Sequence, residues 1–451
     1  MLHLDDARKI ECEFKIIQTR DGTILSLCNM IIDDLGLIFS NNFQISLLSG
    51  KTIEGYEIIT DGPITRRDSH FSGSGECQMV LLVSSVNIKM ASDVGLETIS
   101  FGMTNFEFES NLWSEEIPSP GIIQPRRVKA IQINLENEQI LIRQVLDYEN
   151  IIKKLNVFET IDVTCEISLP ISKNDNIPEK VTIAKNLCFL LSVARGTRIN
   201  WIYYKVHNGN KLISISHHNN ITKKFNSSNG VINDRIENCN IKYFLDCTYN
   251  TYLERKRLYQ LERIINAYLD AKAKGDYMEI RGAKLSIAME NLKSVYLEAC
   301  SSIKPDEDSD LITEYIINEE SFNNYRKDLE GLLKIFLEKK GIVENQRGRI
   351  YKNLPCINRS SFEDILRSLW KDIGLSLDDN TICLFINSRN SLVHQCEFYC
   401  KTSRSSKKCI ALSNRTEEYF FLVNILDKTI LKFLGYKGSY YNLQKRSSDS
   451  I

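Results

Sequence analysis

A change of periodicity near residue 250 divides the chain and limits the folds open to it. Upstream, short runs rich in β-branched and aromatic residues alternate with turn residues, as in "GTILSLCNMII", "CQMVLLVSSVNIKM" and "TISFGMTNFEFES". Downstream, apolar residues recur at helical spacing, first at Leu258, Leu261, Ile264, Ile265 and Leu269. The pattern predicts an α+β protein in which a β-rich N-terminal domain, sandwich or barrel-like, precedes a C-terminal all-α helical bundle.

Three segments follow from this pattern: a β-rich domain at residues 1–145, a mixed α/β continuation of it at 146–245, and the helical bundle at 246–440. In the continuation, "VARGTR" (Val193–Arg198) is interpreted as a tight turn between a helix and a strand, with a phosphate site as the alternative. Beyond the helix around Leu261, helices are predicted for "EIRGAKLSIAMENLKSVYLEAC", "INEESFNNYRKDLEGLLKIFLEKK", "RSSFEDILRSLWKDIG", "TICLFINSRNSLVHQ" and "NRTEEYFFLVNILDKTILKFLG".

Composition favours a globular cytoplasmic protein. An apolar fraction of 43% over 451 residues is enough for real cores, and the apolar runs are too short or too interrupted to span a bilayer. The 13 cysteines are odd in number and scattered singly through apolar contexts, which suits reduced thiols better than a secreted disulfide framework. The sequence therefore predicts no membrane association and a location in the cytoplasm.

The stretch "TICLFINSRNSLVHQ" (Thr381–Gln395) combines an apolar helix face with charged and polar residues. Arg389 falls near the middle of the apolar stripe formed by Ile382, Phe385, Ile386, Leu392 and Val393. A guanidinium cannot shed its charge, so a packed face that contains one must supply anions or acceptors, or must not be an ordinary core. Pairing of this helix with its own copy across a two-fold axis would turn the face into a shared cleft.

A polar ridge lies beside that stripe, made of Asn387, Asn390 and His394 within about 60° of one another on the helical wheel. Such residues suit cleavage of RNA without a metal or another cofactor. Histidine can take the 2′-hydroxyl proton or give one to the leaving 5′-oxygen, arginine can bind the charge that grows on phosphorus, and an asparagine amide can orient the phosphate. Arg389 and His394 are about 140° apart on an ideal helix, so either the helix bends or the two residues serve opposite sides of the cleft.

A basic segment follows this helix. Residues 341–451 hold 17 Lys and Arg against 11 Asp and Glu, a net charge of about +6, although the whole chain carries −1. Lys401, Arg404, Lys407 and Lys408 lie in "KTSRSSKK", which contains no acidic residue. With Asn387, they are candidate contacts to the RNA phosphates, and a solvated polar loop is the alternative.

The arginine, polar residue, three spacers and histidine of "RNSLVH" resemble the RNxxxH motif of HEPN-domain ribonucleases. The wider layout resembles the ApeA-type phage-defence family, on "GLIFS", "ISLLSGKTIEGYEIIT", "ISFGMTNFEFESNLW", "LCFLLSVARGTRINWIYY" and "AMENLKSVYL". The resemblance implies that Arg389, Asn390 and His394 form the catalytic motif of a metal-independent endoribonuclease. It further implies a composite site in a homodimer or larger homo-oligomer, and an abortive-infection role in which the N-terminal domain senses a phage-derived trigger.

Three other interpretations remain open. Glu290 in "SIAMENL" is the candidate internal partner of Arg389 in a purely structural salt bridge. His394, Cys396, Cys400 and Cys409 offer four ligands within sixteen residues for a structural zinc ion, although no Cys-x-x-Cys pair is present. A catalytically silent HEPN scaffold that binds RNA or a protein partner is the alternative function.

Overall fold

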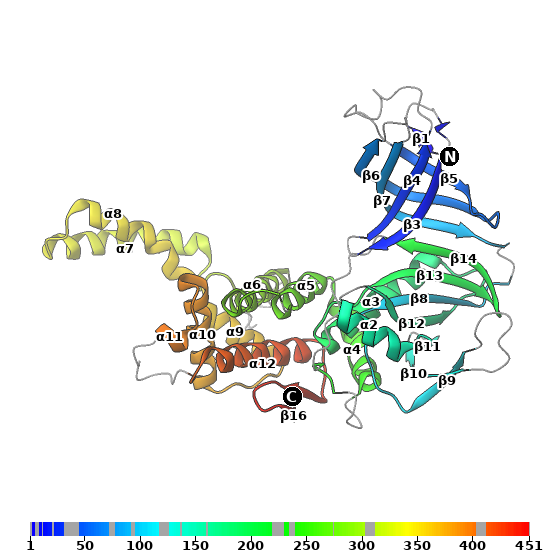
Figure 1. Ribbon diagram of the computed structural model, residues 1–451. Helices are drawn as coiled ribbons and strands as arrows, with labels where there is room; N and C mark the ends of the chain where they lie inside the picture. The colour runs from blue at the N-terminus through cyan, green and yellow to red at the C-terminus, as the bar shows by residue number, and fades with distance from the viewer. Residues whose placement is uncertain are drawn as a thin grey trace. The chain divides into compact units, whose positions relative to one another are not determined.

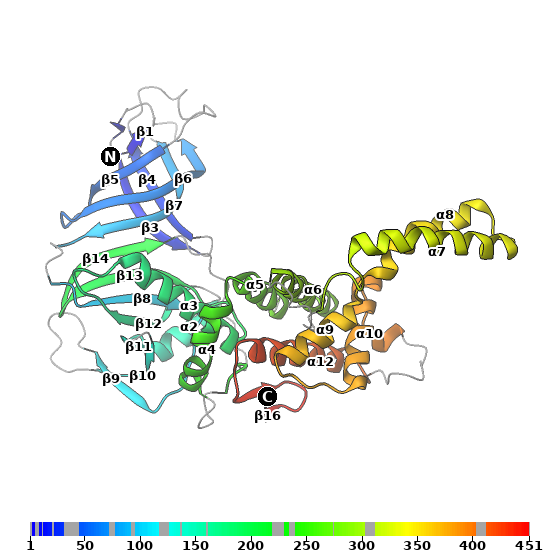
Figure 2. The ribbon, with the colours of Figure 1, turned by 180° about the vertical axis from the view of Figure 1, so that it is seen from behind.

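The computed structural model divides the chain into a β-rich unit and a helical unit (Figures 1 and 2). Unit 1 consists of residues 1–249, 438–441 and 447–450, and unit 2 of residues 250–437, 442–446 and 451. This arrangement confirms the α+β class, with an antiparallel sheet toward the N-terminus and helices toward the C-terminus. The structure describes the whole chain except residues 1, 5–8, 11, 20–21, 31–44, 72–76, 92–94, 117–125, 136–137, 159–160, 219–229, 234–239, 274, 303–311, 403–411 and 451.

Fourteen described strands of unit 1 form one antiparallel sheet. They are β1 (Leu2–Leu4), β2 (Lys9–Ile10), β3 (Glu13–Thr19), β4 (Gly22–Met30), β5 (Ile45–Lys51), β6 (Glu57–Phe71), β7 (Cys77–Lys89), β8 (Thr98–Thr104), β9 (Leu112–Glu116), β10 (Arg126–Leu135), β11 (Glu138–Gln144), β12 (Val163–Pro170), β13 (Trp201–Asn208) and β14 (Lys211–His218).

The strand order is β2-β1-β5-β6-β7-β14-β13-β8-β12-β11-β10-β9, with β3 joined through β4 to β7. The first half of β7 pairs with β4 and its last residues pair with β14, so this one long strand connects both parts of the sheet. These fourteen strands are therefore joined by hydrogen bonds into one continuous sheet. Pairings such as β8 with β13 join segments about 100 residues apart, and such non-local pairings leave no sequence signal.

Two helices of unit 1 are α2 (Tyr148–Phe158) and α3 (Ile177–Arg195). Packing of α3 on β8 and β13 buries Leu187, Leu190 and Leu191. The helix ends at Gly196, whose φ of 64° is the left-handed conformation that glycine adopts without strain, and Thr197 N–H donates to Ser192 O at 3.2 Å. The predicted turn between a helix and a strand is confirmed, and it begins at Gly196, after the last helical residue Arg195.

The remaining helices are α4 (Ile241–Arg255), α5 (Leu261–Lys272), α6 (Met278–Ser302), α7 (Glu319–Lys339), α8 (Glu344–Asn353), the short 3-10 helix η1 (Leu354–Asn358), α9 (Phe362–Asp372), α10 (Asp379–Gln395), α11 (Tyr399–Thr402) and α12 (Arg415–Phe433). Side-chain caps begin two of these helices: Ser361 accepts from the Asp364 N–H at 3.1 Å, and Asn414 accepts from Glu417 N–H at 3.0 Å. No described helix is long and apolar enough to cross a membrane.

The C-terminal region differs from the prediction in several elements. The first helical stretch is interrupted at residues 256–260, where Gln260 has a φ of 42°, so Leu258 lies in a turn instead of a helix. Helix α8 was not predicted, because it buries none of its residues and therefore has no apolar stripe. The short helices η1 and α11 and the hairpin of β15 (Ser439–Asn442) and β16 (Ser447–Ser450) were not predicted either.

Candidate functional site

The predicted motif lies on α10, a continuous α-helix from Asp379 to Gln395. Asp378 caps its start by accepting from Thr381 N–H at 2.9 Å, and Cys396 ends it in the left-handed conformation with a φ of 55°. Because no break interrupts the helix between Arg389 and His394, the two side chains leave it in different directions.

The apolar stripe of α10 is buried in part. Ile382, Phe385 and Leu392 are buried as expected, whereas Ile386 is half-buried and Val393 is 38% exposed. The α10 helix packs on α6, and Gly282 of α6 allows close approach, because an added Cβ there would lie 3.0 Å from Leu392 Cδ2 and 3.1 Å from Phe398 Cζ. This tight contact sets the spacing of the two helices near the motif.

Arg389 is held inside the same chain by an acidic partner. Its Nη2 forms an ion pair with Oε1 of Glu290 on α6, which is the internal salt bridge considered from the sequence. Its guanidinium also lies over the ring of Phe362 at 4.7 Å from the ring centroid, and its Nη1 donates to Asn390 Oδ1 at 2.8 Å. The side chain of Arg389 is 16% exposed, so it is not fully closed off from solvent.

Lys293 of α6 joins this group and was missed from the sequence. Its Nζ pairs with Glu290 Oε2 at 2.9 Å and lies 5.4 Å from the centroid of Phe362. We call Glu290, Lys293, Phe362 and Arg389 the α6–α10 cluster. Two cations against one carboxylate leave it with a formal charge of +1, which suits an anion. The spacing Glu290-x-x-Lys293 is a sequence signal for one helix face, but nothing local indicates that this face meets α10.

The polar ridge of α10 extends from partly buried to exposed. Asn387 is half-buried and its Nδ2 lies 3.5 Å from Cys383 Sγ, whereas Asn390 and His394 are exposed. Within the described residues, no hydrogen bond or ion pair involves His394. Its imidazole is therefore accessible to a ligand or to another chain at the end of the helix.

The basic segment that follows α10 is only partly described. Lys401 belongs to α11, whose start is capped by the buried Glu418, which accepts from Tyr399 N–H and Cys400 N–H at 2.9 Å each. The candidate phosphate contacts Arg404, Lys407 and Lys408 lie outside the described residues, as do Cys409 and the side chain of Lys401.

The zinc interpretation finds no support in the part of the chain that the structure describes. No group of three or more His, Cys, Asp or Glu side chains in that part could hold a metal ion. His394, Cys396 and Cys400 belong to that part, where neither Cys396 nor Cys400 takes part in a disulfide. The fourth proposed ligand, Cys409, is beyond it.

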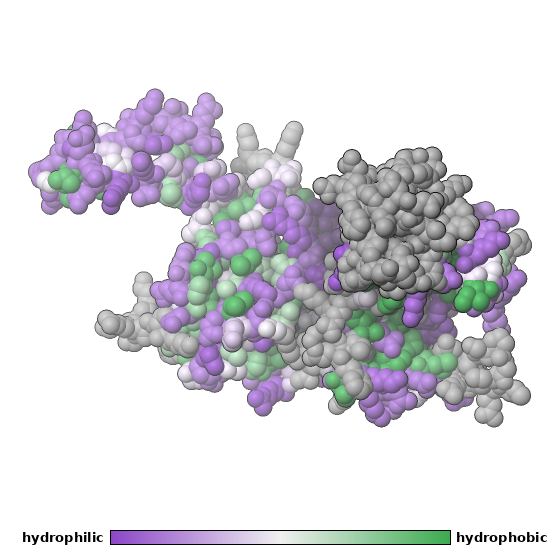
Figure 3. Space-filling model, turned by 45° about the horizontal axis from the view of Figure 1, so that its top comes forward, coloured by the Kyte–Doolittle hydropathy of each residue, from purple (hydrophilic) through white to green (hydrophobic). Residues whose placement is uncertain are grey.

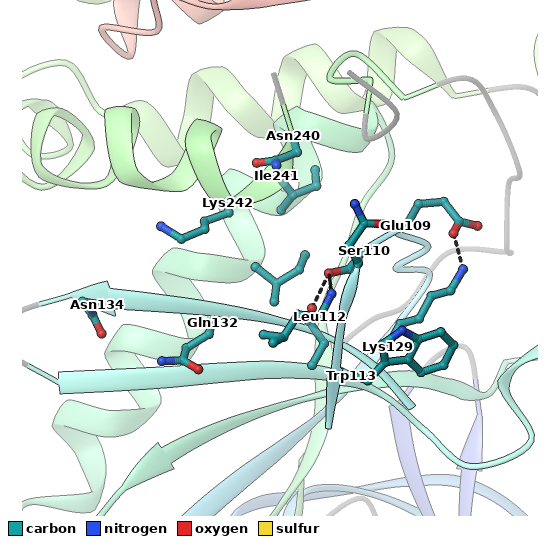
Figure 4. A pocket seen from close by; sticks show the side chains of 13 residues that line it. Glu109, Ser110, Leu112, Trp113, Lys129, Gln132, Asn134, Asn240, Ile241 and Lys242 are labelled. Atoms are coloured by element: carbon teal, nitrogen blue, oxygen red, sulfur yellow. Dashed lines mark hydrogen bonds and ion pairs between the residues drawn. The ribbon is translucent and has the colours of Figure 1, made fainter. Parts of the chain in front are cut away.

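A separate hollow of about 950 Å³ lies in unit 1, between the sheet edge formed by β9 and β10 and the start of α4 (Figure 4). Trp113 and Leu112 of β9 line it and are 55% and 43% exposed. Lys129 and Lys242 also line it, and Lys129 pairs with Glu109. The hollow contains none of the motif residues.

The chain matches no protein-family model, no curated protein and no solved structure. The resemblance of "RNSLVH" to a ribonuclease motif therefore stands on the sequence alone. The structure adds the surroundings of the motif residues: Arg389 is ion-paired with Glu290, whereas Asn390 and His394 are exposed.

Proposed function

We propose that this protein is a metal-independent endoribonuclease of the HEPN class, with Arg389, Asn390 and His394 as its catalytic residues. The observation that carries the proposal is the contrast between two residues on α10. Arg389 is fixed in a cluster of net positive charge, and His394, five residues later, projects into solvent with no partner among the described residues. A held cation and an accessible imidazole are the two groups that RNA transesterification needs.

The chemistry follows from those roles. The RNA 2′-oxygen attacks phosphorus and loses its proton to an imidazole, the bond from phosphorus to the 5′-oxygen breaks, and the 5′-oxygen takes a proton from an imidazolium. Arg389 and Lys293 stabilise the extra negative charge on the phosphorane. The products are a 2′,3′-cyclic phosphate and a 5′-hydroxyl, and no step requires a metal.

A second copy of the chain completes the site in this proposal. On one straight helix Arg389 and His394 diverge by about 140°, so one phosphate cannot easily contact both from a single α10. Two copies related by a two-fold axis could present Arg389 of one chain and His394 of the other to the same phosphate, and two imidazoles could serve as base and acid.

We further propose that unit 1 senses a phage-derived trigger and thereby controls the ribonuclease in an abortive-infection response. The hollow beside β9 is our candidate for the trigger-binding site, because an edge strand with an exposed tryptophan can bind an extended peptide. Replacing Trp113 with alanine should then remove protection against phage in cells while the RNA-cleaving activity of purified protein stays unchanged.

One observation favours the alternative of a catalytically silent scaffold. The ion pair of Arg389 with Glu290 is what a purely structural arginine would form. Under this alternative the protein binds RNA or a protein partner but leaves RNA intact.

Incubation of the purified full chain with a mixed RNA pool in EDTA separates the two. The ribonuclease should release fragments that end in 2′,3′-cyclic phosphate, and RNA extracted from phage-infected cells should show the same ends. The matched variants are His394→Ala and Gln395→Ala, which alter adjacent exposed residues of α10. Intact RNA in both settings would favour the scaffold, and activity that disappears in EDTA would refute the metal-independent mechanism.

A further inference from the structure

An uncovered apolar stripe runs along α7 of unit 2. Tyr325, Leu329, Leu332 and Phe336 lie within about 60° of one another on the helical wheel, and each is between 38% and 67% exposed. We call these four residues the α7 stripe. In the view of Figure 3, green hydrophobic side chains are visible among hydrophilic ones on the lobe formed by α7 and α8.

The apolar face of α7 is wider than the part that its own chain covers. Leu337, on one side of that face, is buried, and α7 packs there on α8 and η1. Arg347 of α8 reaches across this contact to Glu338 of α7 at 2.6 Å. The α7 stripe lies about 100° away from Leu337 around the helix, so the hairpin partner leaves it bare. Four large apolar side chains in one row are more than the scattered exposed residues of an ordinary surface.

The charges of this helix narrow the choice of what covers the stripe. Residues 319–340 carry five acidic and five basic side chains, so their net charge is zero. A helix that binds a nucleic acid or an anionic lipid surface would have an excess of Lys and Arg on its polar face. The two signs are also separated at the ends: Glu319 and Glu320 begin the helix, and Lys339 and Lys340 end it.

We propose that the α7 stripe binds the same stripe of a second copy of this chain, with the two α7 helices antiparallel. Tyr325, Leu329, Leu332 and Phe336 alternate in steps of four, three and four residues, which is the spacing of a coiled-coil seam. A two-fold axis midway between positions 330 and 331 places Leu329 against the partner's Leu332 and Tyr325 against the partner's Phe336. It also brings the acidic start of one helix beside the basic end of the other, whereas a parallel pair would juxtapose like charges.

The test of this interface reads mass and not RNA cleavage, and it rests on the proposed function only in that the α7 contact, and not the α10 cleft, supplies most of the affinity between two copies. Native mass spectrometry and sedimentation of the full chain at micromolar concentration should show a dimer or a larger even-numbered assembly. Leu332→Glu places two carboxylates in the seam and should weaken dimerisation by about 100-fold or more. Leu258→Glu, a matched change at another exposed leucine, should leave the dimer intact.

A mixing experiment tests the antiparallel register. Leu329→Lys alone and Leu332→Glu alone should each be monomeric. An equimolar mixture should form a heterodimer, since the lysine of one chain then faces the glutamate of the other while the second layer keeps its two leucines. Circular dichroism checks that each variant folds. A wild-type monomer at 50 µM, or a dimer that Leu332→Glu leaves unchanged, would overturn the proposal, and failure of the mixture to associate would overturn its register.

Discussion

Two carboxylates in this protein each hold more than one cation, and the comparison separates a structural charge cluster from a reachable one. In unit 1, Glu166 of β12 accepts from Arg143 Nη2 at 3.0 Å, from Tyr203 Oη at 3.1 Å and from Lys205 Nζ at 3.4 Å. In unit 2, Glu290 of α6 pairs with Lys293 and Arg389. The side chain of Glu166 is 9% exposed and that of Glu290 is 27% exposed.

Strand register explains why the first cluster is closed. Arg143, Glu166, Gly102 and Tyr203 are successive partners across β11, β12, β8 and β13. Gly102 has no Cβ, and an added one would lie 2.4 Å from Tyr203 Cζ, so the tyrosine ring lies over the glycine and reaches Glu166. Backbone pairing therefore fixes the positions of these four residues relative to one another.

The histidines near each cluster differ in the same way. In unit 1, burial and then the charge of Lys205 lower the pKa of His207 and of His217, which keeps both rings neutral near pH 7. In unit 2, His394 stands exposed on the helix that carries Arg389. A buried arginine Nε without a hydrogen-bond partner does not distinguish the two clusters, because Arg143 and Arg389 each have such an Nε among the described residues. The α6–α10 cluster differs from the Glu166 cluster in two respects: its carboxylate is more exposed to solvent, and the helix that carries Arg389 also carries an exposed imidazole.

The largest effect is expected at His394. His394→Ala should reduce RNA cleavage by a factor on the order of 100 to 10,000, because it removes a proton-transfer group. The free energy of unfolding should change by less than about 0.5 kcal/mol, since the residue is exposed. Cleavage rates and urea unfolding measure the two. His217→Ala in unit 1 should leave the cleavage rate unchanged. A His394→Ala protein that still cleaves RNA would contradict the catalytic role of His394.

Arg389→Ala should lower the rate of RNA cleavage without lowering the stability of the fold. Cleavage should fall by a factor on the order of 100 to 1,000, as it does when one donor to a developing oxyanion is removed. Stability should stay level or rise slightly, because the change also relieves the cost of holding a guanidinium in a packed interface. A loss of several kcal/mol in urea unfolding would instead favour the structural role of its pair with Glu290.

The two carboxylates should differ in what they contribute to stability. Glu166→Ala should lower the free energy of unfolding by about 3–5 kcal/mol, because it leaves Arg143 and Lys205 without their buried partner. Glu290→Ala should cost about 1 kcal/mol or less, as for a partly exposed ion pair. Urea unfolding followed by circular dichroism compares them, and equal costs would contradict the distinction between closed and reachable clusters.

The sequence predicted those features of the site that depend on one helix or on local context. Helical periodicity placed Arg389 on the packed face of α10, and the apolar neighbours of Glu290 in "SIAMENL" marked it as the internal partner. Phe362 and Lys293 were missed, because which faces of α9 and α6 meet α10 depends on tertiary packing, including the close approach at Gly282.

The fold shows the same division between local and distant causes. Alternation and helical spacing predicted the β-rich and helical parts and the turn that ends α3 at Gly196, since each depends on neighbouring residues. The single sheet was not predicted, because the pairing of β8 with both β12 and β13 joins distant segments. The uncovered stripe of α7 was likewise invisible, because an apolar helix face in a sequence does not reveal whether its own chain covers it.

A smaller effect is expected from the basic segment after α10. Replacing Lys401, Arg404, Lys407 and Lys408 with serine should weaken RNA affinity by about tenfold. The slope of log affinity against log salt concentration should also become less negative, by up to about three, because each phosphate bound by a cation releases counterions. Filter binding across a salt series measures both. The same number of substitutions at exposed lysines of unit 1 should leave the slope unchanged, and an unchanged slope in the basic variant would make this segment solvated surface.

The pH dependence of stability tests the closed cluster directly. Burial raises the pKa of Glu166, but Lys205 and Arg143 outweigh it, so the pKa lies below its ordinary value of 4.5. A lowered carboxyl pKa stabilises the fold above the unfolded value, and this contribution is lost as the pH falls through the folded value. The difference in unfolding free energy between the natural protein and Glu166→Gln should therefore be constant from pH 7 to about 5 and shrink below about 4.5.

His218 affects stability at higher pH. Burial and then the charge of His217 lower its pKa to about 4, so between about pH 6.5 and 4 the unfolded chain binds a proton that the folded chain does not. The contribution of His218 to stability should decline over that range by at most about 1.4 kcal/mol per pH unit, and His218→Asn should remove this part of the decline. Urea unfolding at half-unit steps of pH would show both, and a Glu166→Gln difference that grows as the pH falls would mean that the carboxylate is not held by its cations.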